Sequence, residues 1–510
     1  MIALPAIACW GAAALFVGGS PGAAGLLAGL AGAGTAAAVA LRRMTIGWLL
    51  LGVTIGAATT ALHLHALRSS VTATLVGRSG LVPVAMTLVR DPVELTSGRG
   101  FRFVLAAATV TRIDGRPDRA PVTVLAHGSG WLGLLPSQRL RVEARIGPPR
   151  PGDPAAATVR VAGAPELVGR PRLWQRVAGQ VRAAFRTATS GLPPDERGLV
   201  PGLVIGDTAA MPADLVVAFR SSGLTHLNAV SGENVAVVLA TVGALLRRTW
   251  AGRRTRAVVS LLAILGFVVL ARPSPSVLRA AVMGGIVVAG ALVGRRGQPL
   301  PALATAVVAL IAVDPFLART PGFALSVLAT AAIVVGARPV ADRLARRMPR
   351  PLAVAVAVPL VAQIACTPVL VAAFGSLTPW AVPANVLAAP AVAPATVAGV
   401  ACAVVAVPLP ALAHALAWVA AVPSGWLALT ARGFAGLPGA GAALPPDLAV
   451  PASIVFVAVL CSVESFFTAG CMPCLARGRR DRRRGRRGVP RQPGGERGGA
   501  RVRRGGTRDP

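Results

Sequence analysis

The polar residues with the clearest chemical potential lie in one segment, GLVIGDTAAMPADLVVAFRSSGLTHLNAVSGENVAVVLATVGALL at 202–246. Those that precede or begin its apolar helix are Asp207, His226, Asn228, Ser231, Glu233 and Asn234. Polar and ionisable groups at membrane depth are costly, so they normally face a cavity, a pore or one another. If the surrounding chain lies in a membrane, this segment predicts a transport site.

The composition indicates that the chain does lie in a membrane. It has 510 residues, of which 54% are hydrophobic and 14% charged. That is more apolar surface than one soluble core can bury. Several nearly uncharged stretches run for about 17 to 25 residues, the length a helix needs to cross a bilayer. The net charge of +33 requires a negative partner, lipid headgroups or nucleic acid, and composition alone does not choose between them.

The chain is predicted to contain five regions. Residues 1–67 form N-terminal spans at about 2–18, 22–41 and 44–64, and 68–170 form a β domain outside the membrane. Residues 171–196 contain an amphipathic interfacial helix, with Trp174, Val177, Val181 and Phe185 on one face and Arg176, Arg182 and Arg186 towards the other. Residues 197–468 are mainly further spans, and 469–510 are an Arg-rich tail too polar to fold.

The β domain is predicted from short alternating runs such as FRFVLAAATVTRI and QRLRVEARI, separated by Gly and Pro turns. This pattern favours a small, OB-like barrel. The domain has 14 Arg and 7 acidic residues, and this positive charge is suited to binding nucleic acid. Few aromatic side chains, however, are present to stack bases. A solvated surface beside anionic lipid fits the charge equally well.

Four ordered motifs then point to a family. They are GDTAAMPADLVVAFRSSGLTHLNAVSGENVA at 206–236, PSPSVLRAAVMG at 273–284, DPFLARTPGFALSVLAT at 314–330 and QIACTPVLVAAFGSLTPWAVPANVLAAPAV at 363–392. Together with the β region, they make the chain similar to the ComEC competence family over about 20–468. The resemblance implies an α-helical polytopic protein of the cytoplasmic membrane that carries single-stranded DNA inwards during natural transformation.

Site residues follow from the motifs and from the cost of burying polar groups. The expected DNA path comprises Asp207, His226, Asn228, Ser231, Gly232, Asn234, Arg279, Gln363 and Asn385. Arg279 is the best candidate for a phosphate contact, and a structural ion pair with Asp314 or Asp207 is an equal alternative. Many family members have S-G-L-H where this chain has Ser231 to Asn234, so a proton-carrying side chain is lost and Glu233 adds negative charge.

The chain lacks the metal ligands that many family members carry. Their C-terminal metallo-β-lactamase-like domain contains H-x-H-x-D-H, whereas the five His here include one local pair, His63 and His65, followed by Leu67 and Arg68. We therefore expect no nuclease activity, no catalytic residues, no bound metal and no cofactor. A lone CxxC at Cys471 and Cys474 is half of a zinc signature. Cysteines in apolar runs are expected to act as small hydrophobic residues.

Three alternatives to a DNA channel stay open. The chain can be a membrane-anchored DNA receptor without a pore, a permease for a small solute, or an intramembrane hydrolase using Ser231 and His226. Five helical residues place those two side chains about 140° apart, which disfavours the hydrolase. The expected partners of a channel are single-stranded DNA, membrane lipids, a DNA-uptake receptor and a cytoplasmic motor, since no nucleotide-binding P-loop is present. Assembly with further copies is left open.

The tail after Phe467 has two interpretations. From 477 onward it holds 14 Arg and 3 acidic residues. It can be a disordered contact for nucleic acid or lipid. Equally, its Arg, Gly and Pro content is typical of GC-rich DNA translated in the wrong frame, which would mark a displaced nuclease-encoding region. Reading the genomic DNA downstream of codon 467 in the other frames decides between them.

Arginine placement predicts the topology. Short basic loops stay in the cytoplasm, so 247–256, 295–298 and 338–350 should be inside and 68–170 outside. Single cysteines at Ser129 and Thr249 should then be labelled from opposite sides by an impermeant reagent. Equal accessibility of the two positions would contradict this topology.

Overall fold

The computed structural model describes residues 3–96, 100–150, 152–228, 232–250, 252–292 and 298–443, with residues 451, 454, 455 and 458. The chain divides into a unit at 1–460 and a second at 461–510. The second unit, which includes the Arg-rich tail and its CxxC pair, lies outside the described residues. Everything below concerns the first unit.

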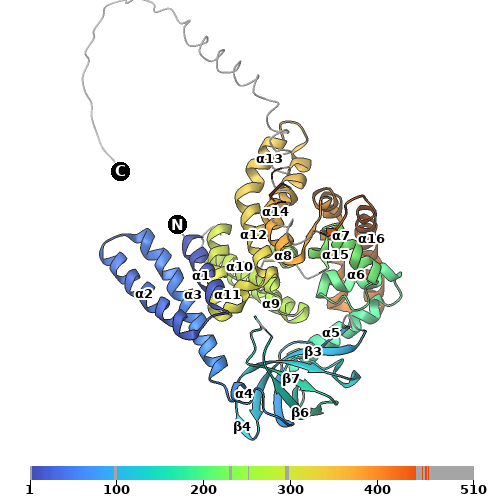
Figure 1. The fold of residues 1–510 in the computed structure, drawn as a ribbon. Helices are drawn as coiled ribbons and strands as arrows, with labels where there is room; N and C mark the ends of the chain where they lie inside the picture. The colour runs from blue at the N-terminus through green and yellow to red at the C-terminus, as the bar shows by residue number, and fades with distance from the viewer. Residues whose placement is uncertain are drawn as a thin grey trace, which may run out of the picture. The chain divides into compact units, whose positions relative to one another are not determined.

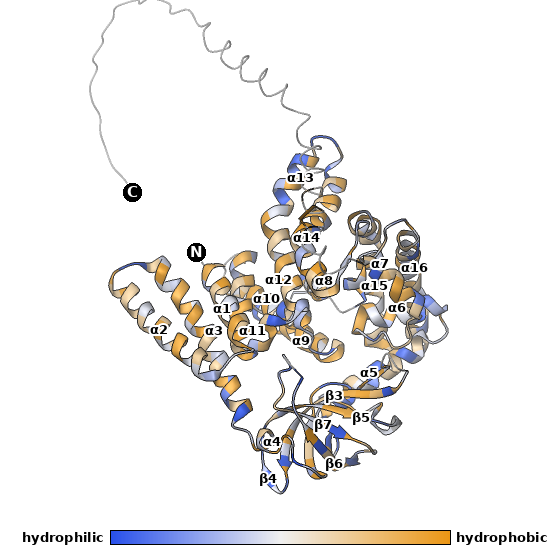
Figure 2. Ribbon diagram, viewed as in Figure 1, coloured by the Kyte–Doolittle hydropathy of each residue, from blue (hydrophilic) through white to orange (hydrophobic). Residues whose placement is uncertain are grey.

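Eight of the described helices are long and apolar enough to cross a membrane, so the chain is a multi-pass membrane protein. They are α2 (Pro21–Ala40), α3 (Met44–Arg68), α9 (Arg253–Ala271), α10 (Pro275–Leu292), α12 to α13 (Pro321–Leu344), α14 (Arg350–Phe374), α15 (Ala381–Val405) and α16 (Pro410–Ala435). Figure 2, coloured by hydropathy, shows that these helices consist mainly of hydrophobic residues. Two shorter apolar helices, α1 (Ala3–Phe16) and α11 (Pro299–Val313), pack among them.

Helices α2 and α3 match two of the three N-terminal spans expected from the apolar runs, whereas α1, with 14 residues, is a shorter apolar helix. Helix α1 packs against α3 at two glycines, because a Cβ at Gly52 would lie 2.2 Å from the Pro5 carbonyl oxygen and one at Gly56 would lie 2.3 Å from that of Cys9. Small residues permit this close backbone approach between membrane helices. Cys9 is buried and free in this contact, as expected for a small hydrophobic residue.

Replacing Gly56 with leucine should therefore separate α1 from α3. We expect Gly56→Leu to destabilise the protein by about 2 kcal/mol or more, because the backbone of α1 cannot relax as a side chain would. Thermal unfolding in detergent measures the change. Gly25→Leu on α2 is the matched control, since a Cβ there meets nothing within 4 Å. Equal melting temperatures for the two variants would contradict the close packing.

The predicted β domain is a closed five-stranded barrel. Its strands are β1 (Val82–Leu88), β3 (Arg102–Ile113), β5 (Pro121–Ala126), β6 (Arg139–Gly147) and β7 (Ala157–Val161). They are hydrogen-bonded in the order β1-β3-β5-β7-β6, and β6 returns to pair with β1. Only β5 and β7 are parallel among these pairs. Short strands β2 (Val93–Thr96), β4 (Arg116–Pro117) and β8 (Glu166–Leu167) flank the barrel.

Period-2 alternation builds the barrel core, as the sequence predicted. Along β6, every second residue is buried, so Leu140, Val142, Ala144 and Ile146 point inwards while Arg139, Arg141, Glu143 and Arg145 stay exposed. Trp131 is fully buried, and its indole N–H donates to the Gly163 carbonyl at 3.1 Å. The result is an apolar interior with an arginine-rich outer face.

In helix α5 (Leu173–Thr189) the buried and exposed faces differ from those predicted from the sequence. The buried residues include Gln175, Ala178, Arg182 and Phe185, whereas Trp174 and Val177 are about half exposed. Arg182 is therefore an inward-facing residue rather than part of a solvated face. The sequence pattern missed this because a buried arginine with hydrogen-bond partners cannot be told from an exposed one by periodicity.

The remaining helices and helical turns are shorter. They are α4 (Val71–Thr74), α6 (Pro194–Ile205), α7 (Ala213–Ser221) and α8 (Gly232–Arg247), with the short 3₁₀ turns η1 (Ser129–Trp131), η2 (Thr225–Leu227) and η3 (Pro315–Arg319) and the π-helical turn η4 (Ile333–Ala337) that continues into α13 (Arg338–Leu344). A two-residue strand β9 (Ser376–Leu377) pairs with β10 (Ala442–Ala443). In Figure 1 the barrel and α13 lie at opposite ends of the helical body. The predicted location of these two regions on opposite sides of the membrane stays a prediction.

Candidate functional site

Asp207 lies in a turn that ends α6. Gly206 caps the helix in the left-handed conformation, with φ 70°, which glycine adopts without strain. The Asp207 carboxylate is nearly buried and accepts a hydrogen bond from Nε of Arg186 at 2.5 Å. Arg182 Nη2 lies 3.7 Å from the same carboxylate oxygen. Asp207 therefore joins α5 to the start of the α6–α7 connection.

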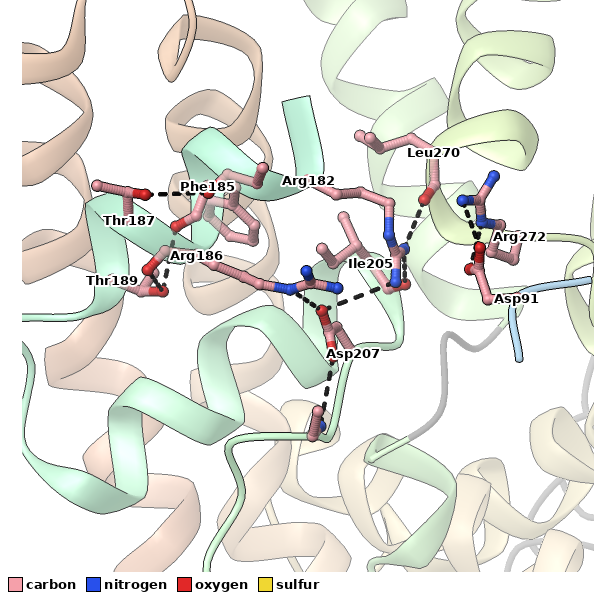
Figure 3. Close-up of polar contacts among 12 residues, drawn as sticks. Asp91, Arg182, Phe185, Arg186, Thr187, Thr189, Ile205, Asp207, Leu270 and Arg272 are labelled. Atoms are coloured by element: carbon pink, nitrogen blue, oxygen red, sulfur yellow. Dashed lines mark hydrogen bonds and ion pairs between the residues drawn. The ribbon is translucent and has the colours of Figure 1, made fainter. Parts of the chain in front are cut away.

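Figure 3 shows that this cluster continues towards the barrel. Arg182 Nη1 donates to the carbonyls of Ile205 at 3.0 Å and Leu270 at 2.9 Å. Burial lowers the pKa of Arg182, and the carboxylates of Asp91 and Asp207 oppose that shift. Arg272 in turn binds both carboxylate oxygens of Asp91, in the loop after β1, at 2.6 and 2.7 Å. Three arginines and two aspartates thus link the barrel to the membrane helices.

Asn234 lies on the buried side of α8. Its Nδ2 donates to the Leu203 carbonyl at 2.7 Å, and its Oδ1 lies 3.5 Å from the Thr396 hydroxyl on α15. The preceding residue, Glu233, is exposed. The carboxylate that departs from the family pattern therefore points away from the packed side of α8.

Arg279 is buried on α10 and binds only neutral partners. Its Nε donates to Ser326 Oγ at 2.8 Å, and its Nη1 donates to Thr330 Oγ1 at 2.8 Å and contacts Met283 Sδ at 3.6 Å. Across the described part of the chain, no carboxylate lies within ion-pair distance of it. The alternative prediction of an ion pair with Asp207 or Asp314 is therefore wrong. Asp207 binds α5, and Asp314 accepts from the Phe316 backbone N–H at 3.0 Å.

Gly232 packs against the Arg279 guanidinium. A Cβ at Gly232 would lie 3.0 Å from Nη2, and Nη2 makes no hydrogen bond to any residue that the structure describes. A guanidinium carries five N–H donors, and those of Nη2 have no hydrogen-bond partner among the described residues. In the same 202–246 segment, Asn228 Oδ1 is buried and has no hydrogen-bond partner among the described residues.

His226, Gln363 and Asn385 lie around a second junction. Gly223, with φ +79°, brings the turn before η2 against α15, where a Cβ would lie 2.5 Å from that of Ala381. Gln363 Nε2 lies 3.3 Å from Thr367 Oγ1 and 3.5 Å from Thr378 Oγ1. The Asn385 amide donates to the Ala381 carbonyl of its own helix at 2.8 Å.

His226 precedes α8 and lies outside the candidate spans. Burial lowers the pKa of His226, and a hydrogen bond with the Gly223 backbone opposes the shift. His226 is nevertheless exposed to solvent as a residue. The lowered pKa favours the neutral imidazole over the charged form.

The predicted site residues thus separate into groups. Gly232 and Arg279 lie together. Asn234 joins α8 to α6 and α15. Gln363 contacts Thr378, just before α15, the helix against which Gly223 packs. Asp207 belongs to the arginine cluster of Figure 3. Ser231 lies outside the described residues, so its predicted role stays a prediction. Cys366 and Cys402, like Cys9, are buried free thiols.

Several polar partners were not predicted from the sequence. Ser326 and Thr330 lie four residues apart on α12 and both bind Arg279. Their i, i+4 spacing in the apolar run FALSVLATAA was the available signal, because residues at that spacing share one helix face. Gln175 and Arg272 were missed because their partners are distant in sequence.

Comparison with known proteins decides the family. The family model described as "Competence protein" matches residues 203–467, slightly more than half of the chain. The chain belongs to the ComEC competence family. The protein is also similar to ComE operon protein 3 of Bacillus subtilis (strain 168), with 30% identity over 213 residues. That match covers 41% of this chain and 27% of the relative, so the chain spans about a quarter of the relative's length. No solved structure matches the chain.

The competence domain, residues 203–467, also binds the N-terminal helices. Arg319, in the motif DPFLARTPG, donates through Nε to the Ala14 carbonyl at 2.6 Å. Its Nη2 lies 3.4 Å from the Leu15 carbonyl. A cation at a helix C-terminus satisfies carbonyls that have no intrahelical partner. Arg319 therefore attaches α1 to the competence domain, and this structural role was not predicted.

Proposed function

We propose that the protein transports single-stranded DNA across the cytoplasmic membrane during natural transformation. Its membership of the competence family indicates a role in DNA uptake, and its eight candidate spans provide the membrane body. Passage of the single strand, the cytoplasmic membrane as location, and the predicted receptor and motor partners belong to the proposal.

The environment of Arg279 carries this proposal. Burying a charged group without a countercharge is costly, and such groups in membrane helices normally serve a transported charge or a charged partner. Arg279 has hydroxyl partners at Nε and Nη1, and Gly232 packs against its Nη2, which has no hydrogen-bond partner among the described residues. A phosphodiester can accept from this nitrogen and supply the missing negative charge.

The barrel gives a second, independent argument. Its strand order, with one parallel pair between β5 and β7, matches an OB-like barrel, a fold that commonly binds oligonucleotides through loops and one strand face. Arg145 on β6 lies directly opposite Arg160 on β7. Like charges placed opposite each other destabilise a sheet, and a bound polyanion would remove that cost.

Reconstitution tests the proposal without relying on cellular partners. The full chain is placed in liposomes, and entry of a fluorescent 20-nucleotide oligo(dT) is measured as signal that resists external DNase. We expect entry driven by a concentration gradient to exceed that of empty liposomes and of liposomes with an Arg279→Met protein.

The alternatives give different results in the same experiment. A receptor without a pore would bind oligo(dT) to the liposome surface, and all of the signal would be lost to DNase. A small-solute permease would show neither binding nor entry of oligo(dT). Either result would reject transport of single-stranded DNA.

A further inference from the structure

Arg272 connects two parts of the chain that are far apart in sequence. It lies in the turn between α9 and α10, and it contacts Asp91 in the connection from β1 to β3, here called the β1–β3 loop, whose described residues, 89–96 and 100–101, include the short strand β2. Its Nη1 also donates to the side-chain oxygen of Gln175 on α5. Gln175 is buried, and the side chains of Arg272 and Asp91 are 16% and 32% exposed. All three Arg272 nitrogens therefore have partners in this junction.

The backbone of Arg272 is strained in this position. Its φ is +68°, a region that L-amino acids with a side chain rarely adopt. Strain of this kind persists only when surrounding contacts hold it, and it clusters at functional positions. The bidentate pair with Asp91 is one such contact, so the side chain and the strained turn depend on each other.

The location of this pair relates it to DNA passage. In OB-like barrels, the loop between the first and second barrel strands commonly contributes to oligonucleotide binding. Here that loop carries Asp91, while α10 begins three residues after Arg272 and carries Arg279. The ion pair thus joins a loop suited to bind DNA to the helix that carries the candidate phosphate contact.

We propose that the Arg272–Asp91 pair is a docking clamp, which holds the β1–β3 loop on the α9–α10 turn so that DNA leaving the barrel is delivered to α10. The inference rests on the proposed function. Arg272 acts here as a positioning residue, because its donors are occupied by Asp91 and Gln175 rather than free for a phosphate. Losing the clamp should reduce transport while leaving capture by the barrel intact.

Two substitutions separate the side chain from the backbone. Arg272→Gln removes the charge, and Arg272→Gly removes the guanidinium while relieving the strained φ. A purely conformational role for the turn would be preserved in the glycine variant. The swapped pair Asp91→Arg with Arg272→Asp restores opposite charges, and the Gln175 amide can donate to the new aspartate. Arg78→Gln with Asp114→Asn is the matched control, since this exposed barrel ion pair, at 3.1 Å, does not touch the α9–α10 turn.

Three measurements on the full chain are needed. Hydrogen exchange of 89–96 without DNA reports docking, anisotropy of fluorescent oligo(dT) reports capture, and DNase-resistant entry into liposomes reports transport. We expect both single variants to raise exchange about tenfold, to change oligo(dT) affinity by less than about twofold and to lower entry at least about tenfold. The swapped pair should recover docking and entry, and the Arg78 and Asp114 control should match the wild type. Unchanged exchange of β3 and β5 shows that the barrel remains folded.

Several outcomes would overturn the clamp. Wild-type exchange at 89–96 in both single variants would show that the pair does not dock the loop. Raised exchange with wild-type entry would show that docking does not serve transport. Failure of the swapped pair, with an intact barrel, would show that the opposite charges are not the cause. If the wild type itself admits no oligo(dT), the proposed function fails, and the exchange data show separately whether the loop is docked.

Discussion

Arg279→Met is expected to lower DNA uptake by about 100-fold, equivalent to about 2.7 kcal/mol of lost interaction with the passing strand. The same substitution should leave the protein as stable as the wild type or make it more stable. Removing a buried charge that has no countercharge also removes its desolvation cost, and methionine fills a similar volume. DNase-resistant entry and thermal unfolding in detergent measure the two effects.

The combination of these effects identifies the role of Arg279. A structural arginine would show the opposite stability result, since Ser326 and Thr330 would lose their partner and melting would occur at lower temperature. Arg279→Lys is the conservative control. Lysine keeps the charge but not the planar donor arrangement, so we expect DNase-resistant entry of DNA to fall by about tenfold. Wild-type entry by Arg279→Met, at normal protein levels, would remove Arg279 from the DNA path.

The sequence predicted the architecture well because the physical signals were local. Apolar runs of membrane length marked the spans, and period-2 alternation marked the barrel, where the strands β1, β3 and β6 bury every second residue over most of their length. A closed barrel with the OB-like strand order and eight candidate spans confirm the predicted fold class. Both signals depend on residues near one another in the chain.

The partners of the polar residues were harder to predict. Asp207 was expected on the DNA path, yet its contacts come from Arg182 and Arg186 on a helix assigned to the headgroup region. Arg279 was expected to contact phosphate or to pair with an aspartate, whereas the partners that the structure shows are hydroxyls 47 and 51 residues away. Residue spacing within one helix cannot show which distant side chain packs against it. The partners of the charged side chains could therefore be identified only from the three-dimensional structure.

Asp207→Ala should produce the second large effect, and this effect is on stability. Removing the carboxylate leaves Arg182 buried, with a side chain only 10% exposed, and without its nearby countercharge. Breaking a buried ion pair from one side typically costs about 3 kcal/mol or more. We expect a loss of this size in the free energy of unfolding, measured by denaturant titration in detergent. Arg186→Ala should cost about 1 kcal/mol or less, because its side chain is 56% exposed and solvent screens the pair.

A double substitution separates this structural role from a role on the DNA path. Arg182→Met with Asp207→Leu removes both charges, so neither is left buried alone, and the stability lost in Asp207→Ala should largely return. If Asp207 serves only the junction of α5 with α6, DNA uptake should return with it. Restored stability without uptake would mean that the carboxylate also acts on the transported strand. Wild-type stability in Asp207→Ala would instead contradict the buried ion pair itself and return Asp207 to the role that the sequence predicted.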